Sequence, residues 1–153
     1  MKRISFLLSM ATAMSLSVFV NPAPGNSQAL EPLPATPKNC IYFREVTSGQ
    51  IQVRKRSQRG NENTDFAVPT GVRFTYYIAQ LVPENNATYD AELFFKYNDG
   101  SNSRVFNKSI AGRRFVRQSA TFRSPSMRQP FQINFRISTA RNNAYQISLL
   151  GCK

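Results

Sequence analysis

The stretch Phe131-Gln132-Ile133-Asn134-Phe135-Arg136-Ile137 decides the fold, because large apolar residues alternate with polar ones along its whole length. A period of two places the apolar side chains on one face of a β-strand and the polar ones on the other. We therefore predict a strand that buries one face. The segment from Ala144 to Leu150 alternates in the same way, and Arg141-Asn142-Asn143 can form a turn between the two, which predicts an antiparallel hairpin.

A second hairpin is predicted upstream. Apolar residues alternate from Tyr89 to Tyr97, and the segment ends in Asn98-Asp99-Gly100-Ser101. Asp-Gly is a strong hairpin signal, because both residues tolerate the positive φ that tight turns require. The return strand is expected from Arg104 to Ile110.

The remaining segments complete an all-β pattern. Val72 to Val82 is almost continuously apolar, which favours a central strand covered on both faces. We also expect a strand within Arg114 to Arg123, a hairpin of Ile41 to Val46 with Ile51 to Arg56 around Ser48-Gly49, and a polar loop from Ser57 to Pro69.

About eight short strands with no helical period between them predict one fold class. It is an antiparallel two-sheet β-sandwich of jelly-roll or immunoglobulin-like type, with a closed barrel as the main rival. We assign this single domain to residues 40–153. Residues 30–39 contain Pro32, Pro34 and Pro37 and should form an extended tail.

Two cysteines, Cys40 and Cys152, stand at the ends of that domain. We predict a disulfide between them, which would make the first and last strands neighbours. A metal site is disfavoured because the chain has no histidine, and a redox pair because the two lack Cys-X-X-Cys spacing. We predict no cofactor.

The first 29 residues have the order of a secretory signal. Lys2 and Arg3 precede an apolar run from Ile4 to Val20, and Ser27-Gln28-Ala29 has small residues where a signal peptidase needs them. Cleavage is expected after Ala29. An uncleaved anchor is the alternative, but the run is short and interrupted by Ser and Thr. We therefore expect a secreted or periplasmic protein that is not integral to a membrane once the signal is removed.

The surface should be strongly basic, since 20 Lys and Arg stand against 8 Asp and Glu. Ordinary solubilising charge explains such a balance as well as a binding surface does. If the charge binds a polyanion, the partner is an acidic polysaccharide, an anionic envelope surface or an acidic protein; export disfavours nucleic acid. The candidate residues form two clusters: Arg54, Lys55, Arg56 and Arg59, then Arg113, Arg114 and Arg117.

Catalysis has little support in the sequence. Without histidine there is no Ser-His-Asp or Cys-His nucleophile. Asp90 and Glu92 share one strand face and resemble the carboxylate pair of a glycosidase, although surface ion pairs explain them as well. We predict a non-enzymatic binding or structural module. The alternatives are a small carbohydrate-active hydrolase using Asp90 and Glu92, or a subunit of a cell-surface assembly. The sequons at Asn86 and Asn107 matter only if the exporting cell glycosylates.

Overall fold

The computed structural model describes residues 29–153, so residues 1–28 of the predicted signal lie outside the described residues. The described part contains ten strands and no helix. Two of the strands, β1 and β2, are only two or three residues long, and the other eight correspond to the number expected. The strands are β1 (Cys40–Tyr42), β2 (Arg44–Glu45), β3 (Gln52–Arg56), β4 (Asn61–Ala67), β5 (Tyr76–Pro83), β6 (Ala87–Lys96), β7 (Asn102–Gly112), β8 (Gln118–Phe122), β9 (Gln132–Ser138) and β10 (Ala144–Cys152).

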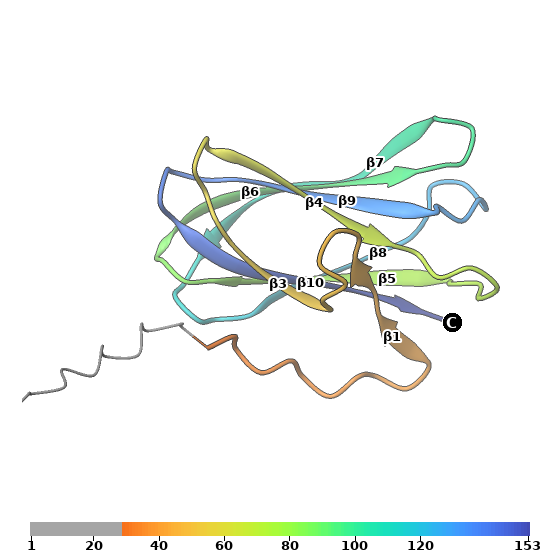
Figure 1. Cartoon of the computed structure of the whole chain (residues 1–153), viewed down its shortest axis with the longest axis horizontal. Coiled ribbons are helices and arrows are strands. Elements are labelled where there is room, and N and C mark those ends of the chain that lie inside the picture. Colours follow the sequence, from red (N-terminus) through yellow and green to blue (C-terminus); the bar gives the residue numbers. More distant parts are fainter. Residues whose placement is uncertain (1–28) are drawn as a thin grey trace, which may run out of the picture.

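The strands form two stacked antiparallel sheets (Figure 1). Sheet A has the order β1-β10-β5-β8, with β3 paired to β10 beside β1, and sheet B has the order β2-β4-β9-β6-β7. Strands β3 to β10 follow the double Greek-key path of a jelly roll. The predicted sandwich is confirmed. Of its two types, the strand order is that of the jelly roll.

Aromatic side chains fill much of the space between the sheets. Tyr77 of β5 lies at the centre of one cluster, with its ring centroid 4.9 Å from that of Phe95 and 5.8 Å from that of Phe122. Tyr89 and Tyr145 meet edge to face at 6.0 Å nearer the other end. The inward residues of both sheets therefore pack into one continuous core.

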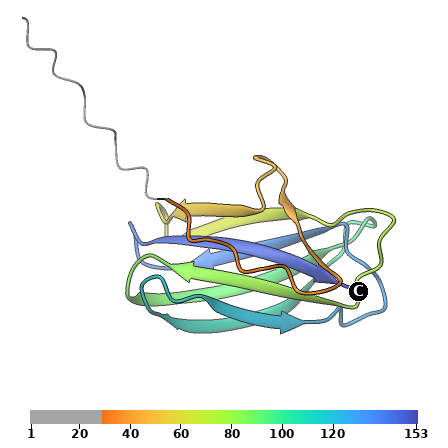
Figure 2. The same cartoon turned by 90° about the horizontal axis from the view of Figure 1, so that it is seen from below.

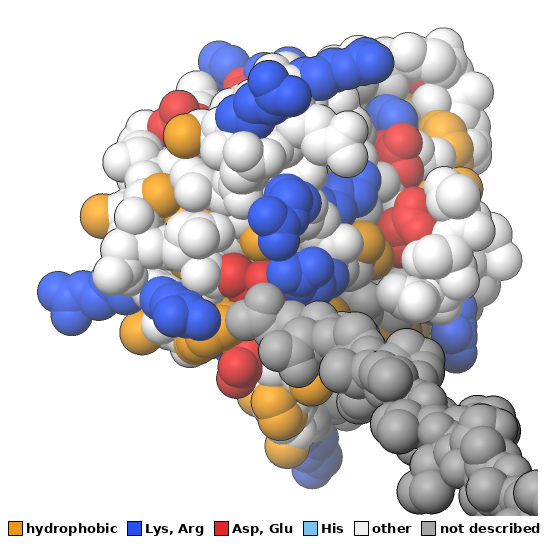
Figure 3. All heavy atoms as spheres, turned by 60° about the vertical axis from the view of Figure 1, so that its left-hand side comes forward, with side chains coloured by type: hydrophobic (Ala, Val, Ile, Leu, Met, Phe, Trp, Pro, Cys, Tyr) orange, Lys and Arg blue, Asp and Glu red, His pale blue; other side chains and the backbone are white. Residues whose placement is uncertain are grey.

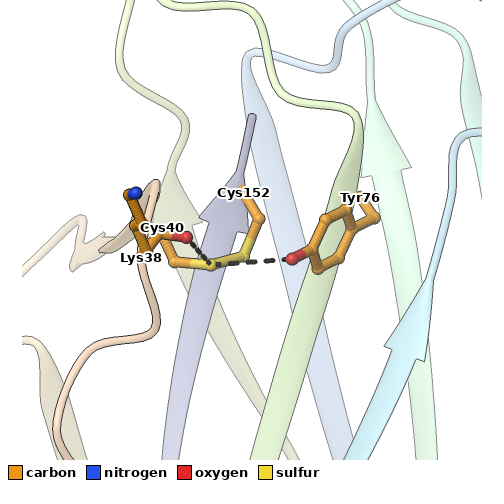
Figure 4. The surroundings of a disulfide bond; sticks show 4 residues. All are labelled: Lys38, Cys40, Tyr76 and Cys152. Carbon is orange, nitrogen blue, oxygen red and sulfur yellow. Dashed lines mark hydrogen bonds between the residues drawn. A yellow bond between two sulfur atoms is a disulfide. The ribbon is translucent and has the colours of Figure 1, made fainter.

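The predicted disulfide between Cys40 and Cys152 is confirmed (Figure 4). The two cysteines stand opposite each other in the β1–β10 ladder, so the first and last strands are neighbours as expected. The hydroxyl oxygen of Tyr76 lies 3.9 Å from Sγ of Cys40. Because the bond closes a loop with a sequence separation of 112 residues, it restricts the unfolded chain by roughly 4–5 kcal/mol in the chain-entropy model.

Residues 30–37 form neither helix nor strand, and they run across the outer face of sheet A (Figure 2). Side chains of the sheet bind the main chain of this tail. The amide N–H of Glu31 donates to Oε1 of Gln146 at 2.7 Å, and Nε2 of Gln52 donates to the carbonyl oxygen of Glu31 at 2.9 Å. Further along, Nη2 of Arg117 donates to the carbonyl oxygen of Pro32 at 2.8 Å. The tail thus covers the outer side of β10.

Two predicted hairpins are wrong. Strands β9 and β10 lie in different sheets, because their apolar faces meet across the core instead of side by side. The segments around Ser48-Gly49 also separate: β1 and β3 pair with β10, and β2 pairs with β4. The chain changes sheets at Phe43, whose buried ring lies against Gly151, where a Cβ would overlap it. The β6–β7 hairpin is as predicted.

Four segment boundaries also differ from the prediction. Residues 57–69 are not all loop, since β4 occupies Asn61–Ala67 with Thr64 and Phe66 facing the core. The strands expected within 72–82 and 114–123 are shorter, at Tyr76–Pro83 and Gln118–Phe122. Phe131 precedes β9 and is 43% exposed, so it does not join the apolar face that Ile133, Phe135 and Ile137 form.

Cys152→Ser should lower the free energy of unfolding by about 2–5 kcal/mol, the usual cost of losing a native disulfide. Urea unfolding of the two proteins measures the difference. The wild-type protein should also be about 2 Da lighter by intact mass than its reduced form, as expected for a single bond. Equal unfolding midpoints for wild type and variant would contradict the assignment of the bridge as a stabilising element.

Phe135→Ala should destabilise the protein by about 3–5 kcal/mol, because the ring is buried and its removal leaves a cavity. Phe131→Ala is the matched control, since the same change at an exposed ring should cost less than about 1 kcal/mol. Both values come from urea unfolding. Equal losses would show that Phe131 is packed in solution.

Candidate functional site

A basic hollow lies at the end of the sandwich where the β3–β4, β5–β6, β7–β8 and β9–β10 loops meet. Its volume is ≈ 340 Å³. Figure 3 brings this end forward and shows Lys and Arg side chains spread over it, with acidic side chains between them. The lining residues are Arg54, Arg56, Glu84, Asn85, Asn86, Arg114, Asn142 and Ala144.

The ladder between β3 and β10 places two of the arginines. Arg54 stands opposite Gln146 and Arg56 opposite Ala144, so both project from the outer face of sheet A. Lys55 lies between them on the opposite face, where its Nζ donates to the carbonyl oxygen of Asn63. The predicted Arg54-Lys55-Arg56 cluster therefore contributes only its two arginines to the hollow.

Two asparagine side chains hold the loops that form the far wall. Oδ1 of Asn85 accepts the amide N–H of Ala144 at 2.7 Å, and Oδ1 of Asn86 accepts the amide N–H of Arg114 at 2.7 Å. The second bond fixes the backbone at Arg114 in the wall of the hollow. The structure thereby brings together members of both predicted arginine clusters.

Glu84 is the buried anion of the hollow. It is 5% exposed, and it accepts hydrogen bonds from Nε of Arg54 at 2.8 and 3.0 Å and from Nη2 of Arg54 at 2.6 Å. Nε2 of Gln146 donates to it at 2.9 Å. Burial would raise the pKa of Glu84, but the bonds from Arg54 and Gln146 and the charge of Arg56 outweigh it and lower the pKa. Glu84 is therefore ionised near neutral pH.

Arg56 and Arg114 supply the cationic character that Glu84 does not neutralise. Both are exposed, and neither forms an ion pair with any of residues 29–153. The guanidinium carbon of Arg114 lies 4.8 Å from the centroid of the Phe115 ring, which supports one face of the group and leaves its edge free. Two guanidinium groups are thus open to an anion.

The other predicted binding residues lie outside the hollow. Arg59 is exposed in the β3–β4 turn, and Arg113 is exposed beside Arg114. Arg117 lies on the outer face of sheet A, where it donates to Oε1 of Gln80 at 3.2 Å and to the tail. Arg117 is therefore part of the tail attachment.

Sequence reasoning missed the polar network that supports this end. Gln146 and Ser148 of β10 are almost fully buried, although strand alternation predicts a solvent-facing side for them. Gln52 donates to Gln146 at 3.1 Å, and Ser148 donates to Gln80 at 2.9 Å. The sequence carries no signal for this burial, because Gln146 and Ser148 alternate with apolar residues as solvent-facing side chains do.

Asp90 and Glu92, the two carboxylates considered for catalysis, both accept hydrogen bonds from neighbouring side chains. Glu92 accepts a hydrogen bond from Nε of Arg136 at 2.6 Å and another from Nη1 of Arg104 at 3.2 Å. The bond from Arg136 lowers the pKa of Glu92, whereas a glycosidase acid needs a raised pKa. Asp90 accepts a bond from the hydroxyl of Ser109. Both carboxylates serve the outer face of sheet B.

Within residues 29–153, no group of three or more His, Cys, Asp and Glu is placed to hold a metal ion. No helix in this part of the chain is long and apolar enough to cross a membrane.

No protein-family model matches the sequence, and no curated protein is significantly similar to it. Solved structures of similar fold include a family 32 carbohydrate-binding module of AlyQ in complex with 4,5-unsaturated mannuronic acid (10% identity, TM-score 0.46, 73% of this chain and 92% of that one). A variant of the family 29 module CBM29-2 complexed with mannohexaose is 10% identical, with a TM-score of 0.48 over 75% of this chain and 82% of that one. Pseudomonas aeruginosa AlgX is 12% identical, with a TM-score of 0.46 over 67% of this chain and 26% of that one. Likeness at this level carries no argument about what the present chain binds.

Glu84→Gln should lower the free energy of unfolding at neutral pH by about 1–3 kcal/mol, because it removes the charge that accepts the bonds from Arg54. The folded-state pKa of Glu84 is below the ordinary value of 4.5, so its contribution is present above that pH and is lost as the pH falls through the folded pKa. Urea unfolding at about pH 7 and about pH 3 should therefore show a gap that narrows in acid.

The control for this experiment is Glu31→Gln, which lies in the same network but uses only its backbone there. It should leave stability nearly unchanged at both pH values, as surface changes usually do. A gap between wild type and Glu84→Gln that stays constant with pH would contradict the assignment of Glu84 as the ionised partner of Arg54.

Proposed function

We propose that the protein is an exported, non-catalytic binding module that holds an acidic group of a polysaccharide in the basic hollow. The carboxylate or sulfate of one sugar residue would lie between Arg56 and Arg114. Arg54, already bonded to Glu84, forms the floor beneath it. The rest of the polymer would follow the basic surface around the hollow.

One observation carries this proposal. Three guanidinium groups from two separate segments of the chain, Arg54 and Arg56 of β3 and Arg114 of the β7–β8 loop, line one concavity that contains a single carboxylate. Diffuse solubilising charge does not require such convergence. Guanidinium groups bind carboxylates and sulfates in a planar, bidentate manner, and they do so most strongly where water is partly excluded.

The polar rim of the hollow supports a sugar in preference to an acidic protein surface. Asn142 is exposed in the lining, in a turn with φ of 71°, and its amide can both donate and accept hydrogen bonds. A volume of ≈ 340 Å³ is at the lower end of the range of about 300–1,000 Å³ typical of small-ligand pockets. A single acidic sugar unit is the ligand that suits both features.

The double change Arg56→Gln and Arg114→Gln should weaken binding to a polyuronate by roughly a hundredfold. That loss is what removing two charge-assisted interactions of about 1.5 kcal/mol each would produce. Isothermal titration with purified polyuronate fragments measures the affinity, and a neutral glucan serves as the negative ligand. Binding by the wild type should weaken with added salt.

The matched control is the double change Arg73→Gln and Arg123→Gln, which alters net charge equally at exposed positions outside the hollow. It should cost less than about threefold, because only the long-range field is reduced. Equal losses of affinity in the two double variants would show that a diffuse cationic field, and not a localised site, accounts for the binding. Equal affinity for the neutral glucan would also contradict the proposal.

A further inference from the structure

A second concavity lies along the side of the sandwich where β7 ends sheet B and β8 ends sheet A. Its volume is ≈ 400 Å³, and it shares no lining residue with the basic hollow. Over residues 29–153 no ladder joins these two edge strands, so the space between the sheets opens here. Leu81, Phe122 and Phe135 line its inner part. We refer to it as the edge slot.

Three alanines account for the depth of the edge slot. Ala79 of β5 and Ala91 of β6 face the core from opposite sheets, and Ala120 of β8 stands opposite Ala79 in the ladder. At these positions the inner faces carry methyl groups, whereas neighbouring positions carry Phe, Tyr or Leu. The space that larger side chains would fill is left open to the edge.

Strand β7 forms the opposite lip, and its inward face contains a lysine. Phe106 stands opposite Leu93, Lys108 opposite Ala91 and Ile110 opposite Tyr89, so all three point toward the core side of sheet B. A β-bulge at Val105 turns two successive apolar side chains, Val105 and Phe106, into the slot. The lip is apolar with one cation in the middle.

The charge of Lys108 has no ionic partner among the described residues. The side chain is exposed, and its Nζ lies 5.9 Å from the centroid of the Phe106 ring. The opposite side of the sandwich shows what a lysine at such a position does when it closes the edge. There Lys55 of β3 also stands on the inward face, opposite Tyr145, and its Nζ reaches the carbonyl oxygen of Asn63 in sheet B.

The two sides of the sandwich therefore differ in the side chains that fill the interior and in the position of the lysine. On the β3–β4 side, the buried ring of Tyr145 stands opposite Lys55, and Lys55 bridges the sheets. On the β7–β8 side, alanines leave the interior open and Lys108 remains at the mouth. An apolar cavity with one cation at its entrance complements an amphipathic anion.

We propose that the edge slot binds the hydrocarbon chain of a fatty acid, with the carboxylate held by Lys108 at the mouth. The apolar chain lies against Leu81, Phe122 and Phe135, and Gln118 offers the head group a second polar partner. Charge complementarity at Lys108 selects the anion over a neutral amphiphile. This site is independent of the basic hollow and of the function proposed for it.

Titration of the disulfide-bonded protein with dansylundecanoic acid, followed by fluorescence, tests this proposal. We expect saturable, blue-shifted emission at a stoichiometry of one molecule per chain. Ala120→Leu should weaken binding by about tenfold or more, because the added methylenes occupy the half-buried slot. Ala111→Leu, the same change on the exposed outward face of β7, should leave the affinity unchanged.

Lys108→Met retains the apolar stem and removes the charge. It should weaken binding of the fatty acid by roughly tenfold, as expected for one charge-assisted hydrogen bond, and leave binding of the matching dansylated alcohol unchanged. Since Lys108 is exposed, this variant keeps the test decisive even if Ala120→Leu does not fold.

Three results would overturn the proposal. The first is the absence of saturable binding, and the second is equal affinity of wild type and Ala120→Leu when both are folded. The third is concentration-dependent dimerisation that is lost in Ala120→Leu, with no fatty acid bound, which would assign the slot to a second copy of the chain.

Discussion

Burial of β10 on both faces is the constraint on which the rest of the structure depends. All nine residues of this strand are buried, although only one face meets the core. Tyr145, Ile147 and Leu149 pack between the sheets, whereas Gln146 and Ser148 point outward and are still shielded from water. A buried polar group without a partner costs about 1–3 kcal/mol, so the outer face must supply hydrogen bonds. Strands β3 and β5 and the tail that crosses them supply these bonds.

The same network links the fold to the candidate site. Gln146 accepts from the tail at Glu31 and donates to Glu84, and Glu84 in turn accepts from Arg54. Arg54 is therefore committed to the fold, while Arg56 and Arg114 remain available for the proposed binding of an anion. Because Arg54 stays bonded to Glu84, this buried carboxylate keeps its partner whether or not an anion is bound in the hollow. A hollow lined only by unpaired guanidinium groups would be destabilised by their mutual repulsion.

Alternation of side chains was sufficient to predict the sandwich, the β6–β7 hairpin and the face of β9 that carries Phe135. It could not predict which sheet each strand joins, because a period of two says which residues share a face and nothing about the neighbouring strand. For the same reason Gln146 was expected to face solvent. The alternation of side chains does not show that the N-terminal tail covers the outer face of the sheet. That Arg56 and Arg114 line one hollow was likewise hidden, because the position of Arg114 depends on a hydrogen bond to a third segment, at Asn86.

The open edge raises the question of how the sandwich avoids pairing with other chains through β7 and β8. An inward-pointing charge on an edge strand is a known protection, because a docking strand would have to bury it. Lys108 provides that protection, and this structural role accounts for its position on the strand. It does not account for the three alanines that leave the slot open. Lys55, on the opposite side of the sandwich, stands over an interior that is filled, and it protects its edge equally well. An unfilled interior beside an unpaired cation suits an apolar chain with a negative end and disfavours a neutral strand. In the proposed site, Lys108 therefore serves both the solubility of the edge and the selectivity of the slot.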